Sequence, residues 1–341
     1  LNINTNLDII SAFEKAVKKY SDRVALRDKD GELSYSELLD LVDRKARSLK
    51  KRLFWHKDIY VAIDLPKSRM SIIMILAVYK AEGVVIPLSV DCPIDRVNNI
   101  IDQTKAEIVI TGRQVDYNVP CFDPFSLDDS DDMSEIAYSN RSDSFAYIMF
   151  TSGSTGEPKG IMIRQKSIIN EVAACYKRFF DLYDDEGAAE LEKPLIIAIL
   201  ADFSFDPSMV QLYTGLFYGN CIVPVPDDVK NSQWKLSEFL SDMKVDCLDI
   251  TPSHLKHVLS FFENKKEEIY LPRNIVSVGE PLTSDFIKKI REFNKAEYVI
   301  NAYGPTEVCV YCTASRFKLD EFCDADDITV GKALDGYEVY I

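Results

Sequence analysis

The sequence predicts an α/β fold in which parallel sheets are covered by helices. Three observations lead to this prediction. Apolar runs rich in Val and Ile recur along the chain, segments with the period of an amphipathic helix lie between them, and 47% of the 341 residues are hydrophobic. Buried runs that alternate with amphipathic segments are typical of parallel sheets flanked by helices. A chain of this length can build one large core or two domains of ordinary size.

Each predicted strand is a short apolar run, and each predicted helix is a longer segment in which apolar residues recur three or four positions apart. The predicted strands are Ile59–Leu65, Gly83–Leu88, Glu107–Thr111, Ala146–Phe150, Leu195–Leu200, Cys221–Val225, Val245–Ile250, Ile275–Val278 and Tyr298–Ala302. The predicted helices include Tyr35–Leu53, Met70–Ala81, Ser167–Phe180, Trp234–Met243, Ser253–Phe262 and Ser284–Phe293.

Two acidic, polar stretches interrupt this pattern. Asp128–Glu135 and Asp181–Glu192 are both predicted to be exposed loops, and the second is the better domain boundary. After Thr313 the sequence becomes irregular. We expect its last apolar run, Tyr337–Ile341, to be a strand cut off from its partners.

The balance of charges argues against two classes of partner. Acidic residues outnumber basic ones by 55 to 40, and the net charge of -15 disfavours attraction to nucleic-acid phosphates and to anionic membranes. No run of about 18 apolar residues occurs, and the first residues lack the basic and apolar regions of a secretory signal. The expected compartment is therefore the cytoplasm.

The eight cysteines are scattered without the spacing of a disulfide framework, so we expect reduced, buried thiols. Cys309 and Cys312 form a CxxC pair, but no second pair stands at the spacing of a zinc site. His254 and His257 fall within a helical pattern. Ordinary packed cysteines are thus favoured over a metal or redox site.

The strongest functional signal is a polar loop, Thr151–Gly160, that directly follows a predicted strand. Its sequence, TSGSTGEPKG, combines hydroxyl side chains with glycines, so main-chain N–H and side-chain O–H groups can donate to phosphate oxygens. Lys159 adds a positive charge. The motif is not a Walker A loop, because Pro158 precedes the lysine and Gly160 follows it. This composition favours a phosphate-binding loop over a simple surface turn.

A second polar motif, Asn301–Glu307 with the sequence NAYGPTE, follows the predicted strand Tyr298–Ala302. The carboxyl ends of parallel strands are where α/β folds bind ligands. Tyr303 offers a flat face for a base, Thr306 a hydroxyl for phosphate, and Glu307 a hard oxygen ligand suited to magnesium. The alternative is a Gly-Pro turn with an unrelated glutamate.

In this order the two motifs resemble those of the adenylate-forming superfamily, and in particular the amino-acid adenylation domains of nonribosomal peptide synthetases. Weaker matches at Leu33–Leu38 and Lys80–Pro87 extend the resemblance from about Leu7 to Ile341. The resemblance implies the N-terminal core of the adenylate-forming fold, with two parallel-type sheets, flanking helices and the start of a β subdomain. It divides the chain into residues 1–187 with the phosphate loop, 188–315 with the substrate pocket, and 316–341.

The resemblance also implies roles for individual residues. The Thr151–Gly160 loop would hold the β- and γ-phosphates of ATP, Tyr303 would stack on adenine, and Glu307 would hold Mg²⁺. The residues implied in catalysis are Thr151, Ser152, Lys159, Thr306 and Glu307. Those implied in nucleotide binding are Ser152, Gly153, Ser154, Thr155, Gly156, Lys159, Gly279, Glu280, Asn301, Ala302, Tyr303, Gly304 and Thr306.

A third match, Phe205–Ser208 with the sequence FDPS, resembles the FDxS motif of amino-acid-activating members. A carboxylate at Asp206 suits the ammonium group of an α-amino acid, because buried opposite charges compensate each other's desolvation. Relatives that activate fatty or aryl acids generally lack this aspartate. The pocket pattern of the family corresponds here to Asp206, Pro207, Val210, Asp249, Val276, Val278, Ala302, Val310 and Tyr311.

Within that set, Asp249 is the exception to a mostly apolar lining. A second buried carboxylate is costly unless something pairs with it, and a substrate with an amine, guanidinium, amide or hydroxyl can do so. We therefore predict a polar or basic amino acid. Two alternatives stay open, because Asp249 can also be protonated or bonded to a backbone N–H.

The implied reaction is attack by the substrate carboxylate on the α-phosphorus of ATP, which releases pyrophosphate and leaves an aminoacyl-adenylate. An ionised carboxylate needs no general base, so positioning and charge stabilisation carry the catalysis. The product would then load the phosphopantetheine of a peptidyl carrier protein, beside other synthetase domains, in antibiotic biosynthesis. Family members continue with a TGD motif, a hinge and a small domain that supplies a lysine. None of these follows Ile341, so we expect this chain by itself to be weakly active or inactive.

Two other functions remain open at this point. An acyl-CoA or aryl-acid ligase of the same superfamily is disfavoured by Asp206. An inactive nucleotide-binding scaffold module is favoured only by the missing lysine domain. Pyrophosphate exchange distinguishes an enzyme from a scaffold, and a panel of amino, fatty and aryl acids distinguishes the two ligases.

Overall fold

The computed structural model describes residues 6–52, 55–126, 136, 138–151, 158–180, 193–265, 268–293, 295–323 and 328–340. The chain forms two compact units. The N-terminal unit contains Ile3–Ile169 and Asp202–Asp206, and the C-terminal unit contains Asn170–Ala201 and Pro207–Ile341. The division into residues 1–187, 188–315 and 316–341 stays a prediction.

The N-terminal unit is built on a sheet with the strand order β6-β5-β3-β4-β7-β8. Its strands are parallel except β8, which runs antiparallel to β7. The neighbouring inner strands β3, β4 and β5 are buried along almost their whole length, as expected for a parallel sheet covered on both faces. The bounds are β3 Tyr60–Asp64, β4 Val84–Pro87, β5 Ile108–Thr111, β6 Cys121–Phe122, β7 Phe145–Thr151 and β8 Lys159–Arg164.

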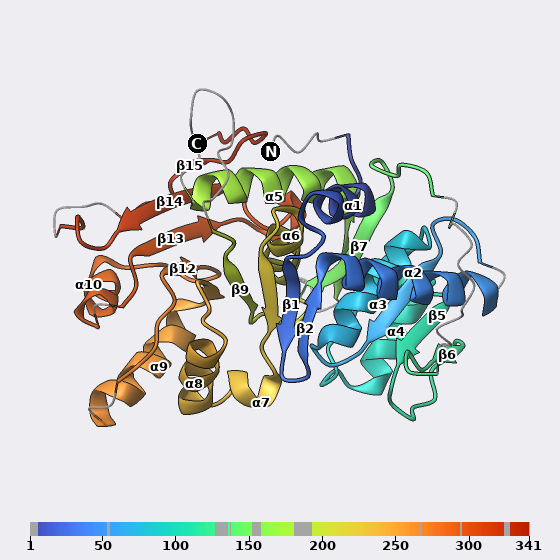
Figure 1. Ribbon diagram of the computed structural model, residues 1–341, viewed down its shortest axis with the longest axis horizontal. Coiled ribbons are helices and arrows are strands. Elements are labelled where there is room, and N and C mark those ends of the chain that lie inside the picture. Colours follow the sequence, from blue (N-terminus) through green and yellow to red (C-terminus); the bar gives the residue numbers. More distant parts are fainter. Residues whose placement is uncertain are drawn as a thin grey trace. The chain divides into compact units, whose positions relative to one another are not determined.

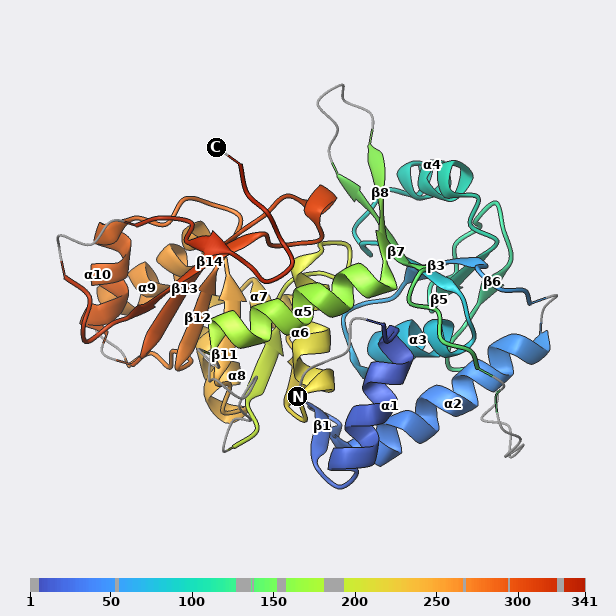
Figure 2. The same ribbon diagram turned by 90° about the horizontal axis from the view of Figure 1, so that it is seen from above.

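Helices cover both faces of this sheet. α3 (Arg69–Lys80) contacts β3 and β4, and α1 (Ile9–Tyr20) and α2 (Tyr35–Arg52) pack against α3. α4 (Ile94–Thr104) lies on the opposite face, as Figure 2 shows, where its apolar side chains join a core with residues of β3, β4 and β5. The antiparallel pair β1 (Val24–Asp28) and β2 (Gly31–Ser34) also belongs to this unit.

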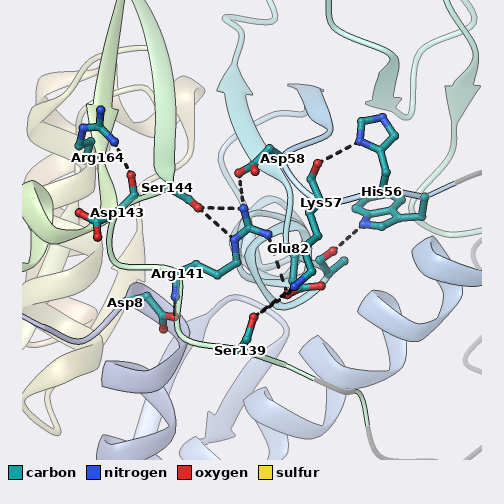
Figure 3. Close-up of polar contacts among 12 residues, drawn as sticks. Asp8, His56, Lys57, Asp58, Glu82, Ser139, Arg141, Asp143, Ser144 and Arg164 are labelled. Atoms are coloured by element: carbon teal, nitrogen blue, oxygen red, sulfur yellow. Dashed lines mark hydrogen bonds and ion pairs between the residues drawn. The ribbon is translucent and has the colours of Figure 1, made fainter.

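A network of hydrogen bonds and ion pairs connects the segments at the amino ends of the parallel strands (Figure 3). Arg141 is buried, and its guanidinium donates to Ser144 at 2.8 Å and to Asp58, while its backbone N–H donates to Asp8 at 2.6 Å. Asp58 precedes β3, and Ser144 precedes β7. Glu82, just before β4, forms an ion pair with Lys57 at 3.3 Å. These contacts join the segments that precede β3, β4 and β7, so we assign this edge of the sheet a structural role.

The C-terminal unit contains strands in the order β15-β14-β13-β12-β11-β9-β10. The strands from β10 to β13 are parallel, and β14 and β15 are antiparallel additions at the edge. The bounds are β9 Ile196–Ile199, β10 Cys221–Pro224, β11 Cys247–Ile250, β12 Asn274–Ser277, β13 Tyr298–Tyr303, β14 Thr313–Lys318 and β15 Lys332–Ala333.

The two faces of this second sheet carry different helices (Figure 1). α8, α9 and α10 pack on one face through a core that includes Leu248, Ile275 and Val299. α6 contacts β9 and β10 from the other face. The bounds are α5 Gln165–Phe179, α6 Pro207–Phe217, α7 Asp227–Lys230, α8 Gln233–Asp242, α9 Pro252–Lys265 and α10 Ser284–Glu292.

The predicted α/β class is confirmed, and each predicted helix and each predicted strand before Thr313 corresponds to an observed one within a few residues at each end. Two expectations are wrong. The sequence after Thr313 is not irregular, because Thr313–Lys318 forms β14 by pairing along its whole length with β13. Residues 337–340 do not form a strand. The predicted loops Asp128–Glu135 and Asp181–Glu192 lie outside the described residues.

Within the described part of the chain, no helix combines the length and the apolar character that crossing a bilayer requires. The cysteines are free thiols. The expectation of buried thiols is correct for Cys175, Cys221, Cys247 and Cys309 and wrong for Cys121 and Cys323, which are exposed.

Candidate functional site

The carboxyl ends of β11, β12 and β13 bring several predicted substrate residues together. In the parallel register Asp249 pairs with Val276, and Val276 pairs with Ile300, so their side chains share one face of the sheet. Ala302 lies two residues further along β13 and therefore points the same way. Their neighbours Leu248, Ile275 and Val299 belong to the core beneath α8, α9 and α10. Asp249 and its partners thus face the side of the sheet that carries α6.

Asp249 is buried, and its partners come from the protein itself. The Tyr311 hydroxyl donates to its Oδ2 at 3.4 Å, and Gln211 of α6 lies beside it. Burial raises the pKa of Asp249 to about 7, because desolvation penalises the charged form more than the hydrogen bonds from Gln211 and Tyr311 favour it. Close to neutral pH this carboxyl group therefore exists in both protonation states, and either can bind a polar group.

One wall of the predicted substrate site, next to Asp249, is the tight turn Val308–Tyr311, which has an unusual backbone. Cys309 and Val310 both have positive φ angles, 71° and 77°, which are rare for residues other than glycine and strained for a β-branched side chain. Gly304 packs beneath the turn, where an added Cβ would lie 2.4 Å from the Val310 carbonyl oxygen. Only glycine fits there. Val310 and Tyr311 are buried on this wall.

Residues predicted to bind the nucleotide lie on neighbouring loops of the same edge. Tyr303 ends β13 and is 54% exposed, as a platform for a base requires. Gly279 has φ +76° in the loop after β12. The next residue, Glu280, accepts the Ser253 N–H at 2.9 Å and so joins this loop to α9. Asn301 is buried, and its side-chain amide donates to the Thr329 carbonyl at 2.9 Å.

The predicted metal ligand, Glu307, lies exposed in the short 3₁₀ helix Thr306–Val308. Among the described residues, no group of three or more His, Cys, Asp or Glu side chains is arranged to hold a metal. Mg²⁺ keeps several waters and is usually held by one or two carboxylates together with substrate phosphates. A single exposed glutamate beside Thr306 fits that mode of binding.

The predicted phosphate loop connects β7 to β8 in the N-terminal unit. Thr151 ends β7, Lys159 begins β8, and the two residues face each other across the antiparallel pair. The side chain of Lys159 is exposed. The loop residues Ser152, Gly153, Ser154, Thr155 and Gly156 lie outside the described part of the chain.

The remaining predicted substrate residues lie directly before α6, on α6 and just past β12. Asp206 is half-buried and directly precedes this helix, which begins at Pro207, a residue favoured at the first helical position. Val210 is buried on α6. Val278 is buried one residue past β12.

Three residues near Asp249 and Tyr311 were not predicted from the sequence. They are Gln211, which also accepts the Leu200 N–H at 3.1 Å, and the hydrogen-bonded pair Glu171 and Tyr337. The available signal in the sequence was that Glu171, an acidic residue, is directly followed by the apolar run Val172–Cys175 of α5. Its partners lie far away in the sequence, so no local pattern reveals them.

Solved structures with this fold include peptide-synthetase enzymes. The N-terminal subdomain of NpsA from Klebsiella oxytoca, in complex with 3-hydroxyanthranilyl-AMSN, has a TM-score of 0.81 and 19% identity, over 96% of this chain and 80% of that chain. The four-domain synthetase holo-AB3403, bound to AMP and glycine, has a TM-score of 0.78 and 22% identity, over 96% of this chain and 23% of that chain. These similarities confirm the predicted fold.

Relatives by sequence include peptide synthetases and other biosynthetic proteins. Bacitracin synthase 1 of Bacillus licheniformis is 27% identical over 98% of this chain, and the dapdiamide synthesis protein DdaD of Enterobacter agglomerans is 30% identical over 87% of it. The chain spans only 6% and 48% of their lengths. The profile of the family described as AMP-binding enzyme matches residues 13–341. Because this match covers nearly the whole chain, the chain belongs to this family of AMP-binding enzymes.

Proposed function

We propose that this chain is the core of an amino-acid adenylation domain, which joins the carboxylate of an amino acid to the α-phosphate of ATP and releases pyrophosphate. The observation that carries the proposal is the grouping at the carboxyl ends of β11, β12 and β13. There the predicted amino-acid residues Asp249, Val276 and Ala302 share one face, and Tyr303 follows directly on the same strand. A small substrate and a base are thereby bound by adjacent residues.

The proposed roles follow from the chemistry of the side chains. Tyr303 stacks on adenine, and the hydroxyl of Thr306 donates to a phosphate oxygen. Lys159 and the N–H groups of the Thr151–Gly160 loop bind the β- and γ-phosphates. Glu307 holds Mg²⁺, which supplies charge neutralisation to the phosphates when it is bound. No residue is needed to deprotonate the substrate carboxylate, so these groups act by orientation and by charge.

Asp206 is the proposed partner of the substrate ammonium group. A carboxylate directly before α6 can compensate a buried positive charge, whereas fatty and aryl acids present no such charge. Asp249 is proposed to bind the substrate side chain and thereby to select the amino acid. Since its pKa is about 7, it accepts from a cationic or amide group when ionised and donates to a carbonyl or hydroxyl when protonated. This supports a polar or basic side chain.

The proposed partners come from the relatives. An artificially fused di-domain of NpsA with ThdA joins an adenylation domain to a PCP. By analogy we include transfer of the aminoacyl group to a phosphopantetheine-bearing carrier protein, within a synthetase whose product is a peptide antibiotic such as those of bacitracin synthase 1 and tyrocidine synthase 1. The compartment proposed for this activity is the cytoplasm.

The test is ATP–pyrophosphate exchange by the protein that carries this chain, against a panel of amino, fatty and aryl acids. We expect exchange with one polar or basic amino acid and none with fatty or aryl acids. Exchange with an aryl or fatty acid alone would replace the proposal with the corresponding ligase. Absence of exchange with ATP binding intact would favour a scaffold.

Two variants assign the ammonium partner. Asp206→Asn removes the negative charge while keeping the shape, so we expect loss of amino-acid-dependent exchange with ATP binding retained. The matched control is Asp228→Asn on α7, an exposed carboxylate that pairs with Lys235 at 3.1 Å. Equal effects of the two substitutions would remove Asp206 from the role.

A further inference from the structure

A buried carboxylate that the proposed chemistry does not use lies behind the wall of the amino-acid site. Glu171 of α5 is 0% exposed. Its Oε1 accepts the backbone N–H of Tyr311 at 2.9 Å and the thiol of Cys175 at 3.2 Å. Its Oε2 lies 2.6 Å from the hydroxyl of Tyr337. Burying a carboxylate this deeply costs free energy of desolvation, and these hydrogen bonds offset that cost.

These bonds hold both ends of the turn that bears the two positive φ angles. Glu171 binds the N–H of Tyr311 at the end of the turn, and the Tyr337 hydroxyl contacts the carbonyl of Val308 at its start, at 2.8 Å. A backbone with Cys309 and Val310 in the left-handed region persists only where the surroundings hold it. Glu171 and Tyr337, which lie outside the turn, stabilise this backbone through their hydrogen bonds.

The turn connects Glu171 to the substrate side of the wall through one residue. The backbone of Tyr311 is bound by Glu171, and its hydroxyl donates to Asp249. A shift of the Tyr311 backbone therefore moves the hydroxyl that stabilises Asp249, and it moves Val310 with it. We infer that Glu171 is a positioning residue that sets the place of Val310, Tyr311 and Asp249 without contacting the substrate. This inference rests on the proposed amino-acid site.

Glu171→Gln should preserve this function, because it can still satisfy the hydrogen bonds of Tyr311 and Tyr337. The Tyr337 hydroxyl has one hydrogen but two acceptors in range, Glu171 and the Val308 carbonyl. A glutamine at 171 keeps an oxygen for the N–H of Tyr311, and its amide N–H donates to the Tyr337 oxygen, so that the hydroxyl donates to Val308. A methionine at 171 fills similar space but can make neither bond.

The experiment compares Glu171→Gln with Glu171→Met in the protein that carries this chain, using pyrophosphate exchange at varied amino acid and varied ATP. For Glu171→Met we expect the KM for the amino acid to rise by roughly tenfold or more while the KM for ATP stays within about twofold. Glu171→Gln is expected to stay within about threefold of the unmodified protein in both. Tyr337→Phe, which keeps the Tyr311 bond, is expected to raise only the amino-acid KM, by roughly threefold.

The matched control is Asp246→Asn. Asp246 is a partly buried carboxylate of the same unit that binds the Ile196 N–H at 2.8 Å and does not contact the turn. A parallel rise of both KM values in Glu171→Met, or an amino-acid KM equal to that of the control, would overturn the positioning role. If Glu171→Met does not fold, an unchanged amino-acid KM in Tyr337→Phe would overturn it instead.

A second readout does not depend on activity. Hydrogen exchange of the amides of residues 310–312 should accelerate in Glu171→Met and stay unchanged in Glu171→Gln, because only the glutamine restores the bond to Tyr311. If the unmodified protein shows no amino-acid-dependent exchange of pyrophosphate, the proposed function fails while the hydrogen-exchange comparison still decides whether Glu171 holds the turn. Equal exchange rates in both variants would contradict the inference.

Discussion

Replacing Asp249 with asparagine tests whether burial raises the pKa of this side chain at the proposed amino-acid site. In the folded protein burial raises the pKa of Asp249 from the ordinary 3.8 to about 7. Between these two values the folded state keeps the proton that the unfolded chain has lost. The folded state therefore binds more protons, and its stability falls as the pH rises through this window. Asparagine has no such proton, so Asp249→Asn should remove this part of the pH dependence.

The expected magnitude follows from the size of the shift. Each pH unit between the two pKa values changes the free energy of unfolding by about 1.4 kcal/mol, so raising the pH from about 5 to 7 should cost roughly 2 to 3 kcal/mol through Asp249 alone. The measurement is denaturant unfolding of the unmodified protein and of Asp249→Asn at several pH values. All other groups titrate in both proteins, so the difference between them isolates Asp249.

We expect the asparagine variant to gain stability relative to the unmodified protein as the pH rises from 5 to 7. Tyr311→Phe is the matched control, because it removes the hydroxyl that donates to Asp249 but leaves the carboxyl group in place. That variant should keep the pH dependence and strengthen it, since the hydrogen bond lowers the pKa of Asp249. Identical pH slopes for the unmodified protein and Asp249→Asn would refute the reasoning.

Three further outcomes are expected. Glu307→Gln should raise the Mg²⁺ concentration needed for half-maximal pyrophosphate exchange by roughly tenfold without lowering the unfolding midpoint, and an unchanged Mg²⁺ requirement would remove Glu307 from the metal site. Gly304→Ala should lower the free energy of unfolding by roughly 1 to 3 kcal/mol because its Cβ meets the Val310 carbonyl oxygen, whereas Gly112→Ala, with open space around the added Cβ, should change it by less than about 0.5 kcal/mol. Arg141→Met should destabilise the N-terminal unit by roughly 3 kcal/mol in thermal unfolding, since it removes the buried guanidinium that donates to Asp58 and Ser144, and a loss below about 1 kcal/mol would contradict the structural role of the network.

The sequence by itself determined the class of the fold and the position of the nucleotide motifs along the chain. Strands such as β9 and β10 are continuous apolar runs, and helices such as α10 repeat apolar residues at helical spacing, because burial on one or two faces must appear in the local pattern. The motif NAYGPTE was also predicted at a strand end, and in the structure its first three residues are the last three of β13. These features are local, so a single chain reveals them.

The tertiary structure alone decided which groups meet. Strand β14 depends on its pairing with β13, and its own sequence, TASRFK, has no strong strand pattern. Asp249 finds its partner Tyr311 across 62 residues of sequence, and Glu171 finds Tyr311 across 140. Periodicity tells which face of an element is buried but not which distant side chain lies opposite. For that reason the raised pKa of Asp249 and the hydrogen bond of Glu171 to Tyr311 could be found only from the tertiary structure.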